Sequence, residues 1–283
     1  MTRELESYLR VDKFPHMWCP GCGNGIVLGS LLRAINELEL DQDKTVIVGG
    51  IGCSSRAVGY LDFNTLHTTH GRALAYATGI KLARPELNVI VITGDGDATA
   101  IGGNHFIHAA RRNIDLTVLL FNNSIYGMTG GQYSPLTPAN SKATTAPYGT
   151  IEPSFDISEL ARSAGASYVG RGTTYHTGLL KGLIKSGIEN KGFSLVEAVA
   201  ACPTAFGRRN KMKGGADMIL WQKENAVNIK KAAQMSPEEL EGKIVVGELH
   251  KQEAPEYTAM YDNLIARVMQ QAGGGSVTPL KGN

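Results

Sequence analysis

The chain has 283 residues, of which 42% are hydrophobic and 19% charged, as expected for a globular protein. Its net charge of +2 argues against a nucleic-acid-binding protein, and it lacks the run of roughly 18 apolar residues that a membrane span requires. The N-terminal segment MTRELESYLRVDKF has no apolar core of a signal peptide, so we expect a cytoplasmic protein. Glycine makes up 34 of the 283 residues, or 12%, against roughly 7% in average proteins. Many of these glycines follow predicted strands.

In chain order, a glycine-rich loop at residues 19–25 precedes a helix expected over residues 26–38. The apolar run 45–51 then predicts a strand that is buried on both faces. An alanine-rich helix is expected over residues 73–82. Strands and helices that alternate in this way favour an α/β fold.

The central stretch, residues 94–131, holds the clearest functional signal. A β-branched strand over residues 89–93 ends in Gly-Asp-Gly-Asp, and a second apolar strand over residues 116–121, beyond an expected helix, ends in Asn-Asn. Two strands joined by a helix should lie parallel. Asp95 and Asn123 would then meet at the carboxyl edge of the sheet, where open α/β sheets bind ligands.

The residue types at this edge suit a metal-bound diphosphate. Gly94 and Gly96 let backbone amides approach a phosphate. Asp95 and Asn123 supply the sparse oxygen ligands that are typical of Mg²⁺. Between the second glycine and the first asparagine lie 25 residues, which resembles the GDG…NN motif of thiamin diphosphate enzymes. Either half alone is also compatible with a turn at a strand end, but the two together favour the cofactor site.

A polar segment without periodicity, residues 132–150, is expected to form an ordered loop over this site. The basic segment 207–215 is interpreted either as a solvated loop or as a docking patch for an acidic partner or an anionic substrate. The remaining expected elements are a helix over 156–164, a strand over 166–170, a helix over 175–190, a last buried strand over 193–201, and amphipathic helices over 217–233 and 257–271.

The four cysteines are Cys19, Cys22, Cys53 and Cys202. In a cytosolic chain they suit metal binding or catalysis better than disulfides. A Cys-x-x-Cys loop at a helix start is typical of a redox pair or of two metal ligands, and the lack of a strand before Cys19 favours ligation. Because Cys53 and Cys202 follow strands, all four thiols can surround one [4Fe–4S] cluster or one structural zinc. Zinc often uses two Cys-x-x-Cys pairs, whereas this chain has one, so we favour the cluster.

Six motifs together resemble the β subunit of 2-oxoacid:ferredoxin oxidoreductases, and most closely the 2-oxoglutarate branch. The resemblance covers residues 15–215. The motifs are WCPGCGNG at 18–25, GIGCSSR at 50–56, THGRA at 69–73, GDGDATAIGGNH at 94–105, FNNSIYGMTGGQ at 121–132 and CPTAFGRRN at 202–210.

The resemblance implies that this chain carries the diphosphate half of a thiamin site and one [4Fe–4S] cluster. Magnesium would be bound by Asp95, Asn123 and the carbonyl of Ile125, and the cluster by the four cysteines. Arg56, at the position of a basic residue that faces the substrate carboxylate, and His70 are the expected catalytic residues. Thiamin diphosphate would be lined by Ile51, Gly52, Cys53, Ser54, His70, Gly96, Asp97, Gly127 and Met128.

The implied reaction is the oxidative decarboxylation of 2-oxoglutarate with coenzyme A to succinyl-CoA and CO2, or its reverse, with electrons leaving through the cluster to ferredoxin. A chain of this length is too short to contain the pyrimidine-binding domain and its glutamate, so we expect an α subunit and an αβ or (αβ)2 assembly. Pyruvate or a range of 2-oxoacids is the alternative substrate. Two other classes stay open: a non-redox thiamin decarboxylase or synthase, and a zinc-stabilised electron-transfer or scaffold subunit.

The predicted fold is therefore an open, mostly parallel α/β sheet with helices on both faces, in the thiamin diphosphate-binding form. We assign residues 1–205 to a domain that binds thiamin diphosphate, magnesium and the [4Fe–4S] cluster. Residues 206–283 are assigned to a helical extension that packs on the same domain. Neither nucleic acid nor a membrane is expected as a partner.

Overall fold

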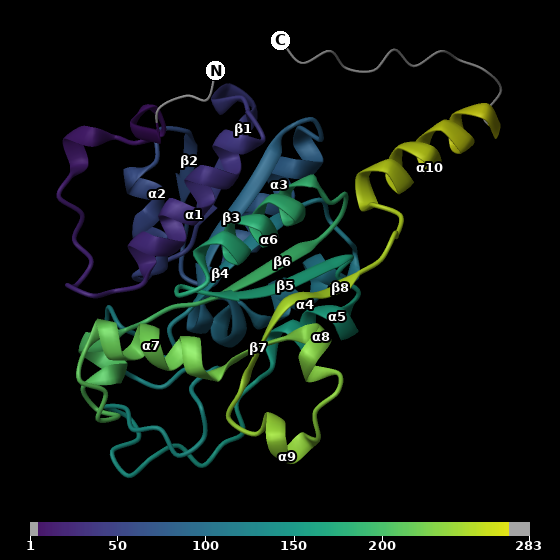
Figure 1. Cartoon of the computed structure of the whole chain (residues 1–283). Helices are drawn as coiled ribbons and strands as arrows, with labels where there is room; N and C mark the ends of the chain where they lie inside the picture. The colour runs from purple at the N-terminus through teal and green to yellow at the C-terminus, as the bar shows by residue number, and fades with distance from the viewer. Residues whose placement is uncertain (1–4, 272–283) are drawn as a thin grey trace.

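The computed structural model describes residues 5–271, and its centre is a sheet of eight strands with helices on both faces (Figure 1). The strands are β1 Thr45–Gly49, β2 Asn64–His67, β3 Asn88–Gly94, β4 Thr117–Asn122, β5 Tyr168–Thr173, β6 Ser194–Val199, β7 Ala226–Asn228 and β8 Ile244–Lys251. Their order in the sheet is β2-β1-β3-β4-β6-β5-β8-β7. Strands β1 to β6 run parallel, and β8 pairs antiparallel with β5. The predicted open, mostly parallel α/β sheet is confirmed.

The helices divide between the two faces of the sheet. The side chains of α1, α2 and α6 pack on one face, and those of α3, α4 and α5 on the other. The α-helices are α1 Asn24–Glu37, α2 Ala57–Tyr60, α3 Ala73–Ala83, α4 Gly103–Arg111, α5 Ile157–Ala164, α6 Thr177–Glu189, α7 Gly215–Asn225, α8 Ile229–Ala232, α9 Pro237–Leu240 and α10 Tyr257–Gln271. Short 3-10 turns lie at Leu5–Tyr8, Val11–Lys13, Gln42–Lys44 and Ser54–Arg56, and π-helical turns at Asp97–Ile101 and Pro203–Gly207.

Strand β4, in the middle of the sheet, shows how the sequence produces this core. All of its residues are buried. Leu119 and Phe121 face the layer of α1 and α6, while Val118 and Leu120 face the layer of α3 to α5. Each buried side chain of this size contributes roughly 1.5–3 kcal/mol to stability. Because both faces are covered, the strand is a continuous apolar run rather than an alternating one.

The carboxyl ends of the central parallel strands form one edge of the sheet. Strand β3 ends at Gly94, which lies in register with Phe121 of β4. On the two outer sides, β1 ends at Gly49 and β6 ends at Val199. Residues that directly follow these strands therefore lie side by side, and they include every motif that the sequence analysis selected after a strand.

The C-terminal extension differs from the prediction. The single helix predicted over residues 217–233 is wrong, because α7 ends at Asn225, strand β7 follows, and α8 begins at Ile229. Strand β8 was not expected either, and its pairing with β5 adds it to the main sheet, where Val246 is buried. The extension is therefore not purely helical. The helix predicted over residues 257–271 is confirmed as α10.

The two predicted domains share one sheet, because β8 comes from the C-terminal segment. Their division at residue 205 stays a prediction, and its outer ends, residues 1–4 and 272–283, lie outside the described residues. Over residues 5–271, no helix combines the length and the apolar character needed to cross a membrane.

Candidate functional site

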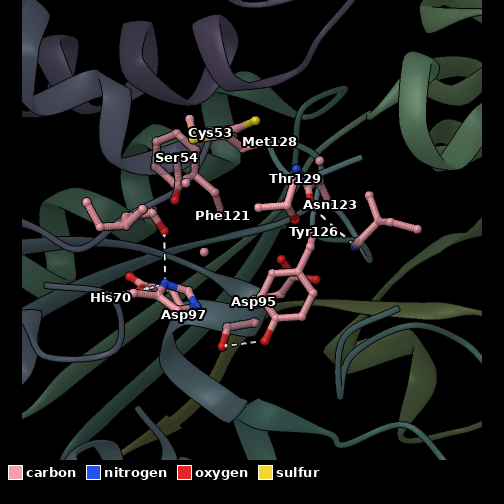
Figure 2. Close-up of a pocket in the computed structure, with 16 residues that line it drawn as sticks. Cys53, Ser54, His70, Asp95, Asp97, Phe121, Asn123, Tyr126, Met128 and Thr129 are labelled. Carbon is pink, nitrogen blue, oxygen red and sulfur yellow. Dashed lines mark hydrogen bonds and ion pairs between the residues drawn. The ribbon is translucent and has the colours of Figure 1, made fainter. Parts of the chain in front are cut away.

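The residues that the sequence predicts to bind thiamin diphosphate and magnesium line a single cavity of about 240 Å³ at the carboxyl edge of the sheet (Figure 2). Asp95, after β3, and Asn123, after β4, are both buried and face this cavity. The structure thus brings together the two halves of the GDG…NN motif. The predicted residues on the cavity wall are Ile51, Gly52, Cys53, Ser54, His70, Asp95, Gly96, Asp97, Asn123, Ile125, Gly127 and Met128.

Asp95 is a buried carboxylate, and among residues 5–271 no cationic side chain forms an ion pair with it. The hydroxyl of Ser134 donates to Asp95 Oδ2 at 2.5 Å. Burial raises the pKa of Asp95 to about 7, although the Ser134 hydroxyl and the amides of Gly96 and Ile125 act in the opposite direction. A carboxylate held in this way fits a divalent cation, which would offset the cost of burying its charge. The donor set of Asp95, Asn123 and the Ile125 carbonyl is therefore suited to Mg²⁺.

Asp97 orients His70 in the same cavity. Its Oδ1 lies 2.7 Å from His70 Nδ1 and accepts a hydrogen bond of 2.7 Å from the Gly71 amide. The hydroxyl of Thr93 donates to the other oxygen, Oδ2, at 2.8 Å. A side chain at Gly50 would overlap this carboxylate, since its Cβ would lie 2.0 Å from Asp97 Oδ2. Because Asp97 engages Nδ1, the Nε2 atom of His70 is the ring nitrogen that remains for a ligand.

Tyr126 closes one side of the cavity and fixes the glycine of the GDG motif. Its hydroxyl donates to the Gly96 carbonyl at 3.1 Å, and its ring contacts the His70 ring edge to face, with centroids 6.1 Å apart. A Cβ on Gly96 would lie 2.1 Å from the Cζ atom of Tyr126. Glycine is therefore required at position 96 for a steric reason, in addition to the approach of a phosphate.

The first asparagine of the NN pair has a structural role. Asn122 Nδ2 donates to Glu197 Oε1 at 2.7 Å, and its Oδ1 accepts from the Ser124 amide at 3.1 Å. Glu197 is buried and paired with Arg171, whose Nε lies 2.6 Å away. Burial lowers the pKa of Arg171, but the carboxylates of Glu197 and Asp156 outweigh it and raise the pKa above its ordinary value. Asn122 thereby ties the turn that carries Asn123 to a buried ion pair.

The four cysteines line a second cavity, of about 320 Å³. None of them forms a disulfide. Their loops are fixed by backbone contacts: the Trp18 indole donates to the Cys53 carbonyl at 2.7 Å, and the Gly23 amide donates to the Ala201 carbonyl at 2.9 Å. After Cys202, the amide of Gly207 donates to the Cys202 carbonyl at 2.9 Å. The predicted meeting of the four thiols at one cavity is thus present.

The chemistry of this cavity fits a bound metal cluster. Burial raises the pKa of the Cys22 thiol to about 12 and that of Cys53 to about 11, and neighbouring thiols add to both shifts. Such thiols become thiolates only when a metal replaces the proton. Within residues 5–271, no three His, Cys, Asp or Glu side chains are grouped around the position of one metal ion.

We call the cavity that contains Asp95 and Asn123 the thiamin cavity, and the cavity lined by the four cysteines the cysteine cavity. Arg56 lines the cysteine cavity and does not line the thiamin cavity. Its side chain is exposed, and across residues 5–271 no hydrogen bond or ion pair engages it. Its charge acts to lower the pKa of Cys53, against the larger effect of burial. The predicted role of Arg56 against a substrate carboxylate stays a prediction. The two cavities adjoin, since Cys53, Asn123, Gly127 and Met128 line both.

Several residues at the thiamin cavity are not among the predicted site residues. Tyr126 and Thr129 line it directly, and their position just after the NN pair was the available signal. Ser134 comes from the aperiodic segment 132–150, whose residues carry no pattern that marks one of them. The expectation that this segment lies over the site agrees with the contact between Ser134 and Asp95.

Comparison with known proteins agrees with this geometry. A family model described as the C-terminal TPP binding domain of thiamine pyrophosphate enzymes matches residues 50–198. The 2-oxoglutarate synthase subunit KorB of Methanothermobacter marburgensis is 54% identical over 266 residues, which cover 94% of this chain and 92% of the relative. The subunit of the same name from Methanocaldococcus jannaschii is 55% identical over 264 residues, covering 93% and 98%.

A solved structure gives the same result for the fold. The 2-oxoglutarate:ferredoxin oxidoreductase from Magnetococcus marinus, with 2-oxoglutarate, coenzyme A and succinyl-CoA bound, superimposes with a TM-score of 0.83 at 33% identity, covering 98% of this chain and 93% of that chain. Fold, cavity and matched domain together define a thiamin diphosphate enzyme. Within that class, the chain belongs to the family of β subunits of 2-oxoacid:ferredoxin oxidoreductases, on the 2-oxoglutarate branch. The resemblance based on the six motifs is confirmed.

Proposed function

We propose that this chain, together with an α subunit in an αβ or (αβ)2 assembly, oxidatively decarboxylates 2-oxoglutarate with coenzyme A to succinyl-CoA and CO2, or catalyses the reverse reaction, in the cytoplasm. Electrons leave through a [4Fe–4S] cluster to ferredoxin. The observation that carries this proposal is the shared wall of the two cavities: Cys53, Asn123, Gly127 and Met128 line both the thiamin cavity and the cysteine cavity. The shared wall supports the proposal because it would put the carbon chemistry and the electron acceptor side by side.

In the thiamin cavity, Asp95, Asn123 and the Ile125 carbonyl would hold Mg²⁺ against the diphosphate. The backbone at Gly96 would approach the phosphates, because no side chain stands there. His70, held at Nδ1 by Asp97, would present Nε2 to the substrate or cofactor. When bound, thiamin diphosphate supplies the electron sink for cleavage of the bond next to a 2-oxo carbon. The chain itself contributes binding, orientation and a buried environment.

In the cysteine cavity, Cys19, Cys22, Cys53 and Cys202 would each bind one iron of the cluster. Their loops are held by backbone hydrogen bonds at the ends of the strands. Cys53 has a special position, because its thiol belongs to a loop that lines the thiamin cavity as well. A two-electron oxidation of substrate can therefore be split into single-electron steps over a short path.

The test is the composition and the substrate preference of the anaerobically purified complex. We expect thiamin, magnesium, and four irons and four acid-labile sulfides for each copy of this chain. We also expect a higher kcat/KM for 2-oxoglutarate than for pyruvate with ferredoxin as acceptor. Stoichiometric zinc without labile sulfide would contradict the redox function and favour a scaffold. Equal or better use of pyruvate would refute the choice of substrate.

A second experiment addresses the partner. The isolated chain should bind thiamin diphosphate weakly and show no oxidoreductase activity, because the pyrimidine half of the site is expected on the α subunit. Calorimetry of cofactor binding to the chain alone and to the complex measures the difference. Efficient decarboxylation by the chain alone would rule out the need for an α subunit.

A further inference from the structure

The proposed function gives no role to the basic segment, residues 207–215, which contains Arg208, Arg209, Lys211 and Lys213. Arg209 is held inward and donates to two backbone carbonyls at 2.9 and 3.2 Å. The other three cations are exposed. In the part of the chain that the structure describes, none of these three forms an ion pair. Their positive charge is therefore directed to solvent or to a partner.

Backbone contacts place the basic segment on the rim of the cysteine cavity. A Cβ on Gly215 would lie 2.5 Å from the carbonyl oxygen of Gly21, so the end of the segment packs directly on the loop that carries Cys19 and Cys22. The segment begins at the turn after Cys202. In Figure 1 this is the region where the N-terminal loop approaches the start of α7. The basic segment thus spans the rim between two cysteine-bearing loops.

Several residues of the two cysteine-bearing loops that the basic segment joins are exposed to solvent. Cys19 is the exposed thiol of the four, and Cys202 is buried. Met17 is 63% exposed, and Pro20 and Thr204 are also exposed. A cluster bound here would come nearest to solvent at Cys19. A small, partly apolar patch surrounded by charged residues is typical of the weak, transient interfaces through which electron-transfer proteins interact.

A further cation adds to the rim. The amide of Lys142 donates to Asn210 Oδ1 at 2.8 Å, and Asn210 Nδ2 donates to the Lys142 carbonyl at 3.1 Å. This reciprocal pair fixes exposed Lys142 beside the basic segment. The nearby acid, Asp217, accepts a hydrogen bond of 3.0 Å from the backbone amide of Lys213. The rim therefore carries a net positive charge and is held in a defined shape.

We propose that the basic segment, with Lys142 and the exposed loop at Cys19, is the docking surface for a small electron carrier with an acidic surface. This inference rests on the proposed function, because it needs a reduced cluster in the cysteine cavity. In the transfer, the cluster is oxidised by one electron and the carrier is reduced by one, and no covalent bond forms or breaks. Opposite charges steer such carriers to the site and make the encounter dependent on salt.

The test uses the complete complex and ferredoxin. The variant Lys211→Glu/Lys213→Glu reverses two charges of the rim. The matched control is Lys230→Glu/Lys231→Glu, which makes the same change at two exposed residues of α8. At low ionic strength, we expect the rim variant to weaken ferredoxin binding and to lower kcat/KM for ferredoxin by about 10- to 100-fold. The control should behave as wild type, and added salt should weaken ferredoxin binding to wild type more than binding to the rim variant.

Reduction of a viologen dye with 2-oxoglutarate separates this inference from the proposed function. The rate of dye reduction should be equal in wild type and in both variants. If the wild-type complex reduces no dye, the proposed function fails, and the equilibrium binding of ferredoxin still tests the docking surface. Unchanged ferredoxin binding in the rim variant overturns the docking surface. An increase in the KM for coenzyme A alone in the rim variant would also overturn it, and would indicate a site for an anionic substrate. Loss of the α subunit from the rim variant would overturn it as well, and would indicate a subunit interface.

Discussion

The thiamin cavity and the cysteine cavity share a wall, yet they are held in shape by different means. In the thiamin cavity, the side chains of Asp95 and Asp97 have protein partners at hydrogen-bond distance. In the cysteine cavity, the thiols come from three loops far apart in sequence, without a disulfide between them. The first cavity is shaped before its ligand arrives, which lowers the cost of binding. In the second, backbone hydrogen bonds hold the loops, and the proposed cluster would link the four thiols once bound.

This contrast predicts the largest effect where the two cavities meet. Cys53→Ser should abolish the cluster, because one iron loses its thiolate, and ferredoxin reduction should fall to background. Iron and acid-labile sulfide analysis of the anaerobic complex measures the loss. The control is Thr204→Ala, which changes a residue of the same cavity that has no thiol and should keep four irons. A Cys53→Ser complex with its full iron content would show that this thiol is not a ligand.

The next largest effect is expected on the thiamin side alone. Asp95→Ala removes the one anionic ligand of the predicted Mg²⁺ site, so affinity for thiamin diphosphate should fall by more than about 100-fold, with the iron content unchanged. Ser134→Ala, which removes only the hydroxyl that contacts Asp95, should cost about 10-fold. Calorimetric titration with magnesium present compares them. Full cofactor occupancy in the Asp95 variant would remove Asp95 from the metal site.

The buried ion pair behind the thiamin cavity predicts an effect on stability. Glu197→Gln leaves the guanidinium of Arg171, whose side chain is 12% exposed, with Asp156 as its remaining carboxylate partner. It should lower the free energy of unfolding by about 3 kcal/mol, measured by urea unfolding. The control is Glu159→Gln, in an exposed pair with Arg162, which should have little effect. Equal stability of the two variants would show that the Glu197 network does not hold the turn at Asn122.

The last prediction concerns Arg56, and it tests whether the substrate carboxylate reaches the cysteine cavity in which Arg56 lies. Arg56→Ala should lower kcat/KM for 2-oxoglutarate by roughly 10- to 100-fold, because a charge-assisted hydrogen bond contributes about 1.5–3 kcal/mol. Its guanidinium suits a bidentate contact with a carboxylate. Comparison of 2-oxoglutarate with pyruvate in wild type and variant is the measurement. If the variant changes only the spectrum of the cluster, Arg56 belongs to the cysteine cavity alone.

The buried parallel strands and the residues after them could be predicted from sequence, because both depend on local patterns, whereas the mostly exposed edge strand β2 was not predicted because it has no continuous apolar run. Strands β3 and β4 are continuous apolar runs, and their ends carry Asp95 and Asn123. The C-terminal strands could not be predicted in this way. Residues 226–228 continue a helical pattern, but they pair with β8 instead, and β8 is positioned by pairing with β5, far away in sequence. Tertiary pairing overrides local preference in both cases.

The same distinction applies to the site. Cys19, Cys53 and Cys202 are predictable as site residues because cysteine is rare and each lies at a recognisable position. Ser134 is not, because it is an ordinary residue in an aperiodic loop, and its role at the site depends on its contact with Asp95. Arg56 was selected by motif, but its placement in the cysteine cavity follows from the 3-10 turn after Cys53, which the motif does not reveal.

The contact between Gly96 and Tyr126 has an evolutionary consequence. Thirty residues separate the two positions, yet a Cβ at position 96 and the ring at position 126 would occupy the same space. Position 96 cannot gain a side chain while the tyrosine is present: a relative with alanine at 96 should carry a smaller residue at 126. Enzyme engineers who wish to place a side chain at position 96 would therefore need to change the tyrosine first, since the reverse order passes through a sterically blocked intermediate.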